Sequence, residues 1–141
     1  MLDLADRLEV RGTIQFLPYQ KRSRLSLSLS TADVHVVGLA RGLAGYVVPS
    51  RLYGILAAGR PVIVAAEDSS ETARLVREIG CGIVIPPARP DLVARTIREA
   101  ASGGFDLDEL GRRGRAYVED EADRVVAMER YRALVREMLA A

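Results

Sequence analysis

Residues 47–64 read VVPSRLYGILAAGRPVIV, and this stretch decides the fold of the 141-residue chain. Apolar residues at helical spacing follow Ser50, whose hydroxyl can cap a helix by accepting a hydrogen bond from a backbone N–H one turn on. Gly59 can end that helix because glycine tolerates positive φ. The β-branched run 62–64 then suits a buried strand. Free N–H groups, a serine and Arg51 at the helix start form a combination that can hold a phosphate.

Length and composition indicate one domain with a hydrophobic core, since 49% of the residues are hydrophobic. The net charge of +1 gives no reason to expect a nucleic-acid partner. The basic run 21–24 is short and lacks aromatic residues, so it is interpreted as a solvated helix start. Cys81 is the only cysteine, which excludes a disulfide framework and favours a reduced, cytoplasmic setting. No signal peptide is visible, and the apolar run 34–40 is too short to cross a bilayer.

Short strands alternate with helices along the chain, which predicts a mainly parallel sheet with helices on both faces. The predicted strands cover residues 13–17, 34–38, 61–65 and 82–85. The predicted helices cover residues 2–9, 23–31, 50–58, 70–79, 90–101, about 106–120 and 122–139. The alternating pattern over residues 25–29 also permits a strand. Ligands in such sheets bind at the carboxyl ends of strands, where the loops 39–50 and 65–70 are expected.

Several segments, in a fixed order, carry a resemblance to a known family. They are Ala32-Asp33-Val34, Pro49–Tyr53, Leu56–Ile63, Cys81–Pro87 with Pro90-Asp91-Leu92, and Gly111–Val118. Together these segments resemble the C-terminal, donor-binding half of GT-B glycosyltransferases. The closest likeness is to group 1 (family 4) retaining enzymes that build bacterial exopolysaccharides such as colanic acid. It implies an α/β fold with a partial, Rossmann-like parallel sheet.

The resemblance implies that this chain binds a nucleotide diphosphate sugar, without a metal ion or other cofactor. By position, Ser50 and Arg51 would contact the diphosphate, and a guanidinium is well shaped for phosphate oxygens. The helix dipole and basic side chains would stabilise the departing diphosphate. Leu17 ends the predicted first strand, where the loop of the family meets the nucleotide base, and Glu71 starts a helix that faces the donor.

Two positions depart from the family pattern. Many members carry a pair of glutamates, of which the second binds the nucleotide ribose. Gly54 stands at that second position and Tyr46 at the first, and neither can accept the hydrogen bonds of a carboxylate. Tyr46, Tyr53 and backbone groups therefore remain the candidates for ribose recognition.

A larger departure concerns the elements that the family places before this region. The family domain opens with a strand, a glycine-rich turn, a helix and a second strand. The resemblance begins after these elements, so we expect them and the acceptor-binding domain to be missing here. In the family strand order 3-2-1-4-5-6, strands 1 and 2 would lie between the first two predicted strands, and their absence would expose two hydrogen-bonding edges. We therefore expect a fragment, a truncated reading frame or part of a split enzyme, inactive alone.

The partners expected from this interpretation are a nucleotide sugar and the missing acceptor-binding domain or a complementary chain. Self-association through an exposed sheet edge is a further expectation. The full-length parent is expected in the cytoplasm, where it could lie at the inner face of the plasma membrane. The catalytic residues are not identified by the sequence.

Structural interpretations stay open beside the functional ones. Ser50 and Arg51 could be a helix cap and a surface arginine, and Glu71 a favourable charge at a helix N-terminus. His35 is more typical of a strand residue than of a catalytic base, because no acid is placed to orient it. Cys81 is expected to be a small buried hydrophobe. Core packing is expected for Phe16, Leu107, Leu110, Tyr117 and Val118.

Two other functions remain as alternatives for the whole chain. One is a non-catalytic, truncated Rossmann-like module that packs on a partner or self-associates. The other is a different nucleotide-binding protein of Rossmann type. The dinucleotide fingerprint Gly-x-Gly-x-x-Gly followed by an acidic residue is absent, which argues against a dehydrogenase.

Overall fold

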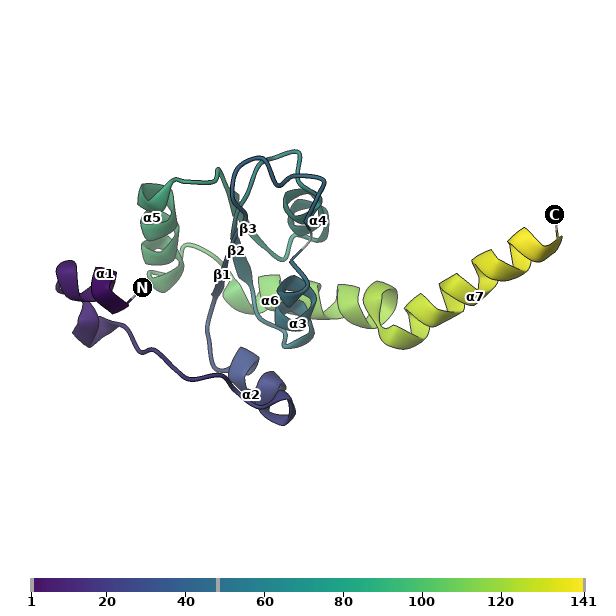
Figure 1. Cartoon of the computed structure of the whole chain (residues 1–141), viewed down its shortest axis with the longest axis horizontal. Coiled ribbons are helices and arrows are strands. Elements are labelled where there is room, and N and C mark those ends of the chain that lie inside the picture. Colours follow the sequence, from purple (N-terminus) through teal and green to yellow (C-terminus); the bar gives the residue numbers. More distant parts are fainter. Residues whose placement is uncertain (1, 48, 141) are drawn as a thin grey trace.

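A parallel sheet of three strands lies at the centre of the molecule (Figure 1). The computed structural model describes residues 2–47 and 49–140. The strands β1 (His35–Gly38), β2 (Val62–Ala65) and β3 (Gly82–Ile85) lie side by side in chain order, and both neighbouring pairs are parallel. The α/β class and these three predicted strands are confirmed.

Helices cover both faces of this sheet (Figure 1). The helices α3 (Arg51–Ala57) and α4 (Glu71–Ile79) lie on one side of the strands, and α5 (Pro90–Ala101) lies on the other. The remaining α-helices are α1 (Leu2–Arg7), α2 (Leu25–Ser30), α6 (Leu107–Tyr117) and α7 (Arg124–Ala140). Short 3₁₀ turns occur at Arg11–Thr13 and Arg22–Arg24, and a π-helical turn at Val118–Ala122. The predicted helix at residues 23–31 is confirmed over α2, so the alternative strand there is wrong.

The central strand β2 is buried on both faces, as its β-branched sequence predicts. Val62, Ile63 and Val64 are all fully buried. Val62 and Val64 join apolar residues of α3 and α4 in the main core cluster. Ile63 faces the opposite side by the alternation of a strand, the side on which α5 packs against β2. Burying each such side chain contributes about 1.5–3 kcal/mol, so β2 anchors both layers.

Local sequence signals explain the ends of α3 and α4. Gly59 follows α3 with φ of 66°, a conformation that suits glycine. The hydroxyl of Ser70 accepts a hydrogen bond from the N–H of Ala73 at 3.2 Å, which satisfies a free donor in the first turn of α4. Gly80 ends α4 in the left-handed conformation. The predicted bounds of α4 are confirmed.

The predicted strand at residues 13–17 is wrong. A 3₁₀ turn occupies Arg11–Thr13, and the residues after it pair with no strand of the sheet. An extended segment gains its ladder hydrogen bonds only from a neighbouring strand, and β1 is not paired with this one. Phe16 is 39% exposed, so its expected core position is also wrong. Its ring instead lies 5.4 Å from the guanidinium carbon of Arg11.

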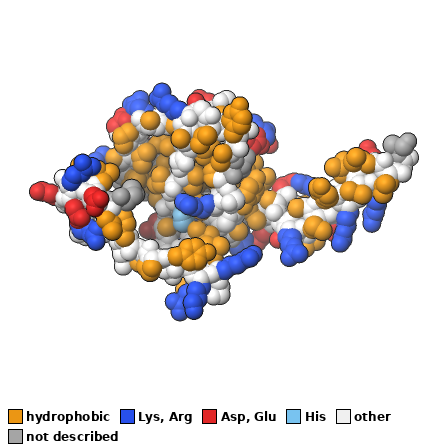
Figure 2. Space-filling view, in the orientation of Figure 1, with side chains coloured by type: hydrophobic (Ala, Val, Ile, Leu, Met, Phe, Trp, Pro, Cys, Tyr) orange, Lys and Arg blue, Asp and Glu red, His pale blue; other side chains and the backbone are white. Residues whose placement is uncertain are grey.

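A gap was expected between the predicted strands at residues 13–17 and 34–38. Because the strand at residues 13–17 does not form, β1 is the outer strand of the described sheet. The N–H groups of His35 and Leu39 donate to the carbonyl oxygens of Pro61, just before β2, and Ala65, at its end. By alternation the N–H groups of Val36 and Gly38 face away from β2. Val36 is 46% exposed at this outer edge. Figure 2 shows hydrophobic side chains around a hollow on the face between the N-terminal segment and the strands, with the single histidine, His35, inside it.

The C-terminal helices differ in detail from their predicted bounds. The predicted helix at about 106–120 ends at Tyr117, and a π-helical turn separates it from α7. The four residues expected in the core here are half-buried: Leu107, Leu110, Tyr117 and Val118. Gly111 and Gly114 are the buried residues of α6. The helix α7 projects away from the sheet (Figure 1). None of the described helices is long and apolar enough to span a membrane.

Candidate functional site

A pocket of about 280 Å³ lies at the carboxyl end of β1. Its walls come from the end of β1 and from the start of α3. The lining residues are Val37 and Gly38 from the strand and Pro49, Ser50 and Arg51 from the start of the helix. The structure therefore places Ser50 and Arg51 beside Gly38, at the carboxyl ends of the strands, where ligands of parallel α/β proteins bind.

The expected capping role of Ser50 is wrong. Ser50 itself has helical backbone angles, with φ of −58° and ψ of −23°, and its side chain makes no capping hydrogen bond. The turn begins one residue earlier, where the N–H of Leu52 donates to the carbonyl oxygen of Pro49 at 3.0 Å. A cap requires extended angles that point the hydroxyl back at the helix, and Ser50 lacks them.

Arg51 is the basic residue that lines this pocket. Its side chain is exposed, so the guanidinium is accessible to a ligand. The helix α3 has only seven residues, and the field of so short a helix is small. The positive charge available to an anion therefore comes mainly from the arginine, which can bind two oxygens of one phosphate at once.

Glu67, which the sequence did not single out, ties the loop after β1 to the loop after β2. Its Oε2 accepts a hydrogen bond from the backbone N–H of Gly42 at 3.1 Å. Glu67 follows β2 by two residues and lies in the loop 65–70, which the strand pattern had placed at the candidate site. An acidic residue just after the strand predicted at residues 61–65 was the sequence signal that could have identified Glu67.

Glu71 lies at the first residue of α4, outside the pocket at Ser50 and Arg51. Its Oε1 is 2.6 Å from Nη2 of Arg74, one turn along the same helix. The hydrogen bond from Arg74 lowers the pKa of the Glu71 carboxyl. This geometry fits a favourable charge at a helix N-terminus, the structural interpretation of Glu71.

The remaining sequence-predicted residues also lie outside the lining of that pocket. Tyr46 is 85% exposed in the loop after β1, Leu17 is 66% exposed, and Tyr53 is 37% exposed on α3. Gly54 turns toward α2, because a Cβ built on it would lie 3.1 Å from Cδ1 of Leu29. A larger side chain at residue 54 would press on α2, which explains physically why glycine suits this helix contact.

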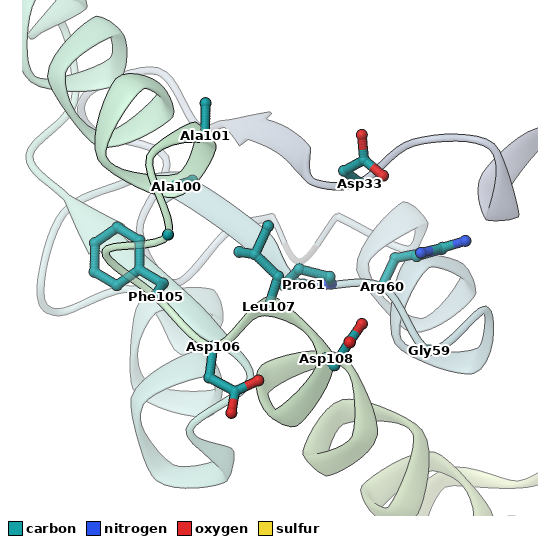
Figure 3. Close-up of a pocket in the computed structure, with 11 residues that line it drawn as sticks. Asp33, Gly59, Arg60, Pro61, Ala100, Ala101, Phe105, Asp106, Leu107 and Asp108 are labelled. Atoms are coloured by element: carbon teal, nitrogen blue, oxygen red, sulfur yellow. The ribbon is translucent and has the colours of Figure 1, made fainter.

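A second, larger pocket of about 430 Å³ lies at the other end of the strands (Figure 3). Asp33, Arg60 and Asp108 surround it, together with apolar groups that include Phe105 and Leu107. Arg60 is already engaged there, since its Nη2 donates to the carbonyl oxygen of Ser30 at 2.6 Å. This pocket is at the amino ends of β1 and β2, so the carboxyl-end pocket is the better ligand site despite its smaller volume.

His35 and Cys81 have structural roles. The Nε2 of His35 lies 2.8 Å from the carbonyl oxygen of Leu29, so it donates a hydrogen bond that joins β1 to α2. Cys81 is fully buried in the core, as expected. Within residues 2–47 and 49–140, no group of three or more histidine, cysteine, aspartate or glutamate side chains is placed to hold a metal ion.

Sequence comparison finds glycosyltransferases. The chain is 32% identical over 115 residues to the probable glycosyltransferase WbjE of Pseudomonas aeruginosa, which covers 82% of this chain and 28% of that protein. It is 33% identical over 88 residues to the putative colanic acid biosynthesis glycosyl transferase WcaI of Escherichia coli strain K12, which covers 62% of this chain and 22% of that protein. The homologues of this chain are glycosyltransferases. The resemblance drawn from the motifs is thereby confirmed.

The structural comparison agrees on the fold. The crystal structure of WaaG, a glycosyltransferase involved in lipopolysaccharide biosynthesis, matches with a TM-score of 0.66 at 22% identity. The match covers 85% of this chain and 30% of that one. The chain thus has the fold of a GT-B glycosyltransferase fragment, and it spans about a quarter of the length of the curated relatives it matches. A search with protein-family profiles finds no match.

Proposed function

We propose that this chain is the donor-binding part of a retaining glycosyltransferase for cell-surface polysaccharide. The observation that carries the proposal is the pocket at the carboxyl end of β1, lined by Ser50 and Arg51, in a chain whose homologues are glycosyltransferases. The donor would be a nucleotide diphosphate sugar whose diphosphate contacts these two residues. A guanidinium supplies paired donors for phosphate oxygens, and the backbone N–H groups at the start of α3 add to them.

The chemistry of the whole enzyme would replace a sugar–diphosphate bond with a glycosidic bond and keep the anomeric configuration. Arg51 would then stabilise the negative charge that develops on the departing diphosphate. The acceptor would bind a domain outside this chain, so we expect the isolated chain to transfer no sugar. We expect the parent enzyme in the cytoplasm, at or near the inner face of the plasma membrane.

Calorimetric titration with UDP, GDP and ADP tests the donor site. At least one of the three should bind the unaltered chain, and Arg51→Ala should weaken its affinity by about tenfold, the loss of a charge-assisted hydrogen bond. Arg95→Ala, which removes an exposed arginine of α5 outside the pocket, should change the affinity less than twofold. No binding of any of the three nucleotides would contradict the proposal.

The free outer edge of β1 favours one alternative, a non-catalytic module that associates through its sheet. Val36 is 46% exposed there, and an unpaired strand edge can pair with another chain. Light scattering over a range of concentrations separates the two functions. A stable dimer that Val36→Lys converts to a monomer, without nucleotide binding, would support the module. A monomer that binds a nucleotide would support the donor site.

A further inference from the structure

The loop residues 39–47 are anchored at their start, next to β1. At the start, Leu39 is buried and its N–H donates to the carbonyl oxygen of Ala65 at 2.9 Å. The middle is largely exposed, and its backbone hydrogen bonds are local, such as that from the N–H of Tyr46 to the carbonyl oxygen of Leu43 at 3.1 Å. Packing therefore contributes little to the position of the middle of this loop.

Among the described residues, one hydrogen bond joins the middle of this loop to a distant part of the chain. The N–H of Gly42 donates to Oε2 of Glu67, 25 residues away, at 3.1 Å. Gly42 has φ of 77°, a conformation that side chains other than glycine rarely adopt, and it belongs to the turn that presents this N–H. A bond to a carboxylate is stronger than one between neutral groups.

The carboxylate of Glu67 stands on a well-anchored turn. The carbonyl oxygen of Glu67 accepts a hydrogen bond from the N–H of Ser70 at 2.9 Å, and Ser70 is buried while it caps α4. Asp68, the next residue, forms an ion pair with Arg77 on the same helix. The turn is thus held to α4 at two points, and these contacts fix the backbone from which the Glu67 side chain extends to the loop.

We propose that Glu67 is a positioning residue that latches residues 39–47 at the carboxyl ends of β1 and β2. These residues follow Val37 and Gly38 in the chain and precede Pro49, Ser50 and Arg51, so the latch holds the segment between the two walls of the pocket. Glu67 acts through Gly42 and does not itself touch the donor. The inference rests on the proposed donor function. It states that one side chain, Glu67, holds the loop beside the donor pocket in position.

The sign of the effect on affinity distinguishes a latch from simple electrostatics. Glu67 is an acid at the same edge of the sheet as a site for an anion, so removing its charge alone would tighten binding. A latch predicts the opposite. With the most tightly bound of UDP, GDP and ADP, Glu67→Ala should raise the dissociation constant about tenfold. Glu67→Asp keeps the charge but shortens the reach, and it should weaken binding by a similar factor.

Glu67→Gln keeps an acceptor oxygen for Gly42, so it should recover most of the affinity. Glu78→Ala is the matched control, because it removes an equal charge from the exposed face of α4 and leaves both the latch and the turn that carries Glu67 in place. In the nucleotide-free chain, amide hydrogen exchange at Gly42 should accelerate in Glu67→Ala and Glu67→Asp and stay slow in Glu67→Gln and Glu78→Ala. Unchanged exchange in β2 would show that each variant is folded.

The two measurements separate the latch from the donor site. Unchanged exchange at Gly42 in Glu67→Asp would overturn the latch, whatever the nucleotide does. Faster exchange with unchanged or tighter nucleotide binding would overturn the positioning role. Failure of the unaltered chain to bind any of the three nucleotides would overturn the donor function and the positioning role together, while the exchange result would still decide whether the latch exists.

Discussion

At the scale of single residues, burial controls the chemistry of Cys81. Burial raises the pKa of its thiol from 9.0 to about 11, since the thiolate would lose its hydration in the core. We expect a thiol-specific reagent at pH 8 to leave the folded chain unmodified and to react rapidly once denaturant unfolds it. Equal rates in the two states would contradict the buried position.

The same shift of the Cys81 pKa sets a pH dependence of stability. The folded-state pKa lies above the unfolded value, so the contribution of the buried thiol is complete below pH 9. It should be lost as the pH rises from 9 toward 11, because the unfolded chain releases the proton first. Urea unfolding of the unaltered chain and of Cys81→Ala over this range measures the difference, which should narrow as the pH rises. A constant difference would contradict the assignment.

Residues also show which parts of the candidate site could be predicted. Ser50 and Arg51 were found because the loop, the helix start and the strand before them all have local sequence signals. Glu67 was missed because its role depends on Gly42, 25 residues away, and no local pattern records that contact. Gly54 marks a departure from the family in the sequence, but its contact with Leu29 of α2 appears only in the structure.

At the scale of elements, two serines precede helices with opposite consequences. Ser70 is extended and caps α4, whereas Ser50 is helical and caps nothing. Ser70→Ala should lower the free energy of unfolding by about 1 kcal/mol. Ser50→Ala should change it by less than about 0.5 kcal/mol, the usual range at a surface position. Chemical denaturation of both variants checks this, and equal losses would contradict the two assigned backbone conformations.

The helix α6 packs closely on the turn between α3 and β2 through a glycine. A Cβ on Gly111 would lie 2.2 Å from the carbonyl oxygen of Gly59, so the helix would have to move. Gly111→Ala should therefore lower the free energy of unfolding by about 2 kcal/mol or more, as overpacking does. Gly12→Ala is the control, since nothing lies within 4 Å of a Cβ there. Similar stability of the two variants would contradict the close packing of α6.

The sequence predicted some elements better than others. Elements fixed by residues within their own segment were predicted correctly, and an element that depends on residues distant in the sequence was not. The helix α4 has a capping serine and a terminal glycine within its own segment, and its bounds were predicted correctly. The strand β2 has a β-branched run that suits burial on both faces. The strand expected at residues 13–17 had the right composition but needs a partner strand, and pairing is a long-range property.

At the scale of the whole molecule, α7 stands apart from the sheet (Figure 1). Its main contacts are with the π-helical turn Val118–Ala122, where Arg130 forms an ion pair with Glu121. Most of its large apolar side chains are exposed: Val125, Met128, Tyr131, Leu134, Val135, Met138 and Leu139. Removing residues 124–141 should change the free energy of unfolding by less than about 1 kcal/mol, because an exposed ion pair contributes little. Loss of cooperative unfolding would contradict this independence.

Amide chemical shifts on titration test whether a nucleoside diphosphate binds at the carboxyl end of β1. With the nucleotide that binds most tightly among UDP, GDP and ADP, the largest shifts should occur at Val37, Gly38, Ser50 and Arg51. The chemical shifts of the amides around Asp33, Arg60 and Asp108, at the amino ends of the strands, should stay unchanged. Shifts confined to those amides, or no shifts with any of the three nucleotides, would contradict binding at the carboxyl end of β1.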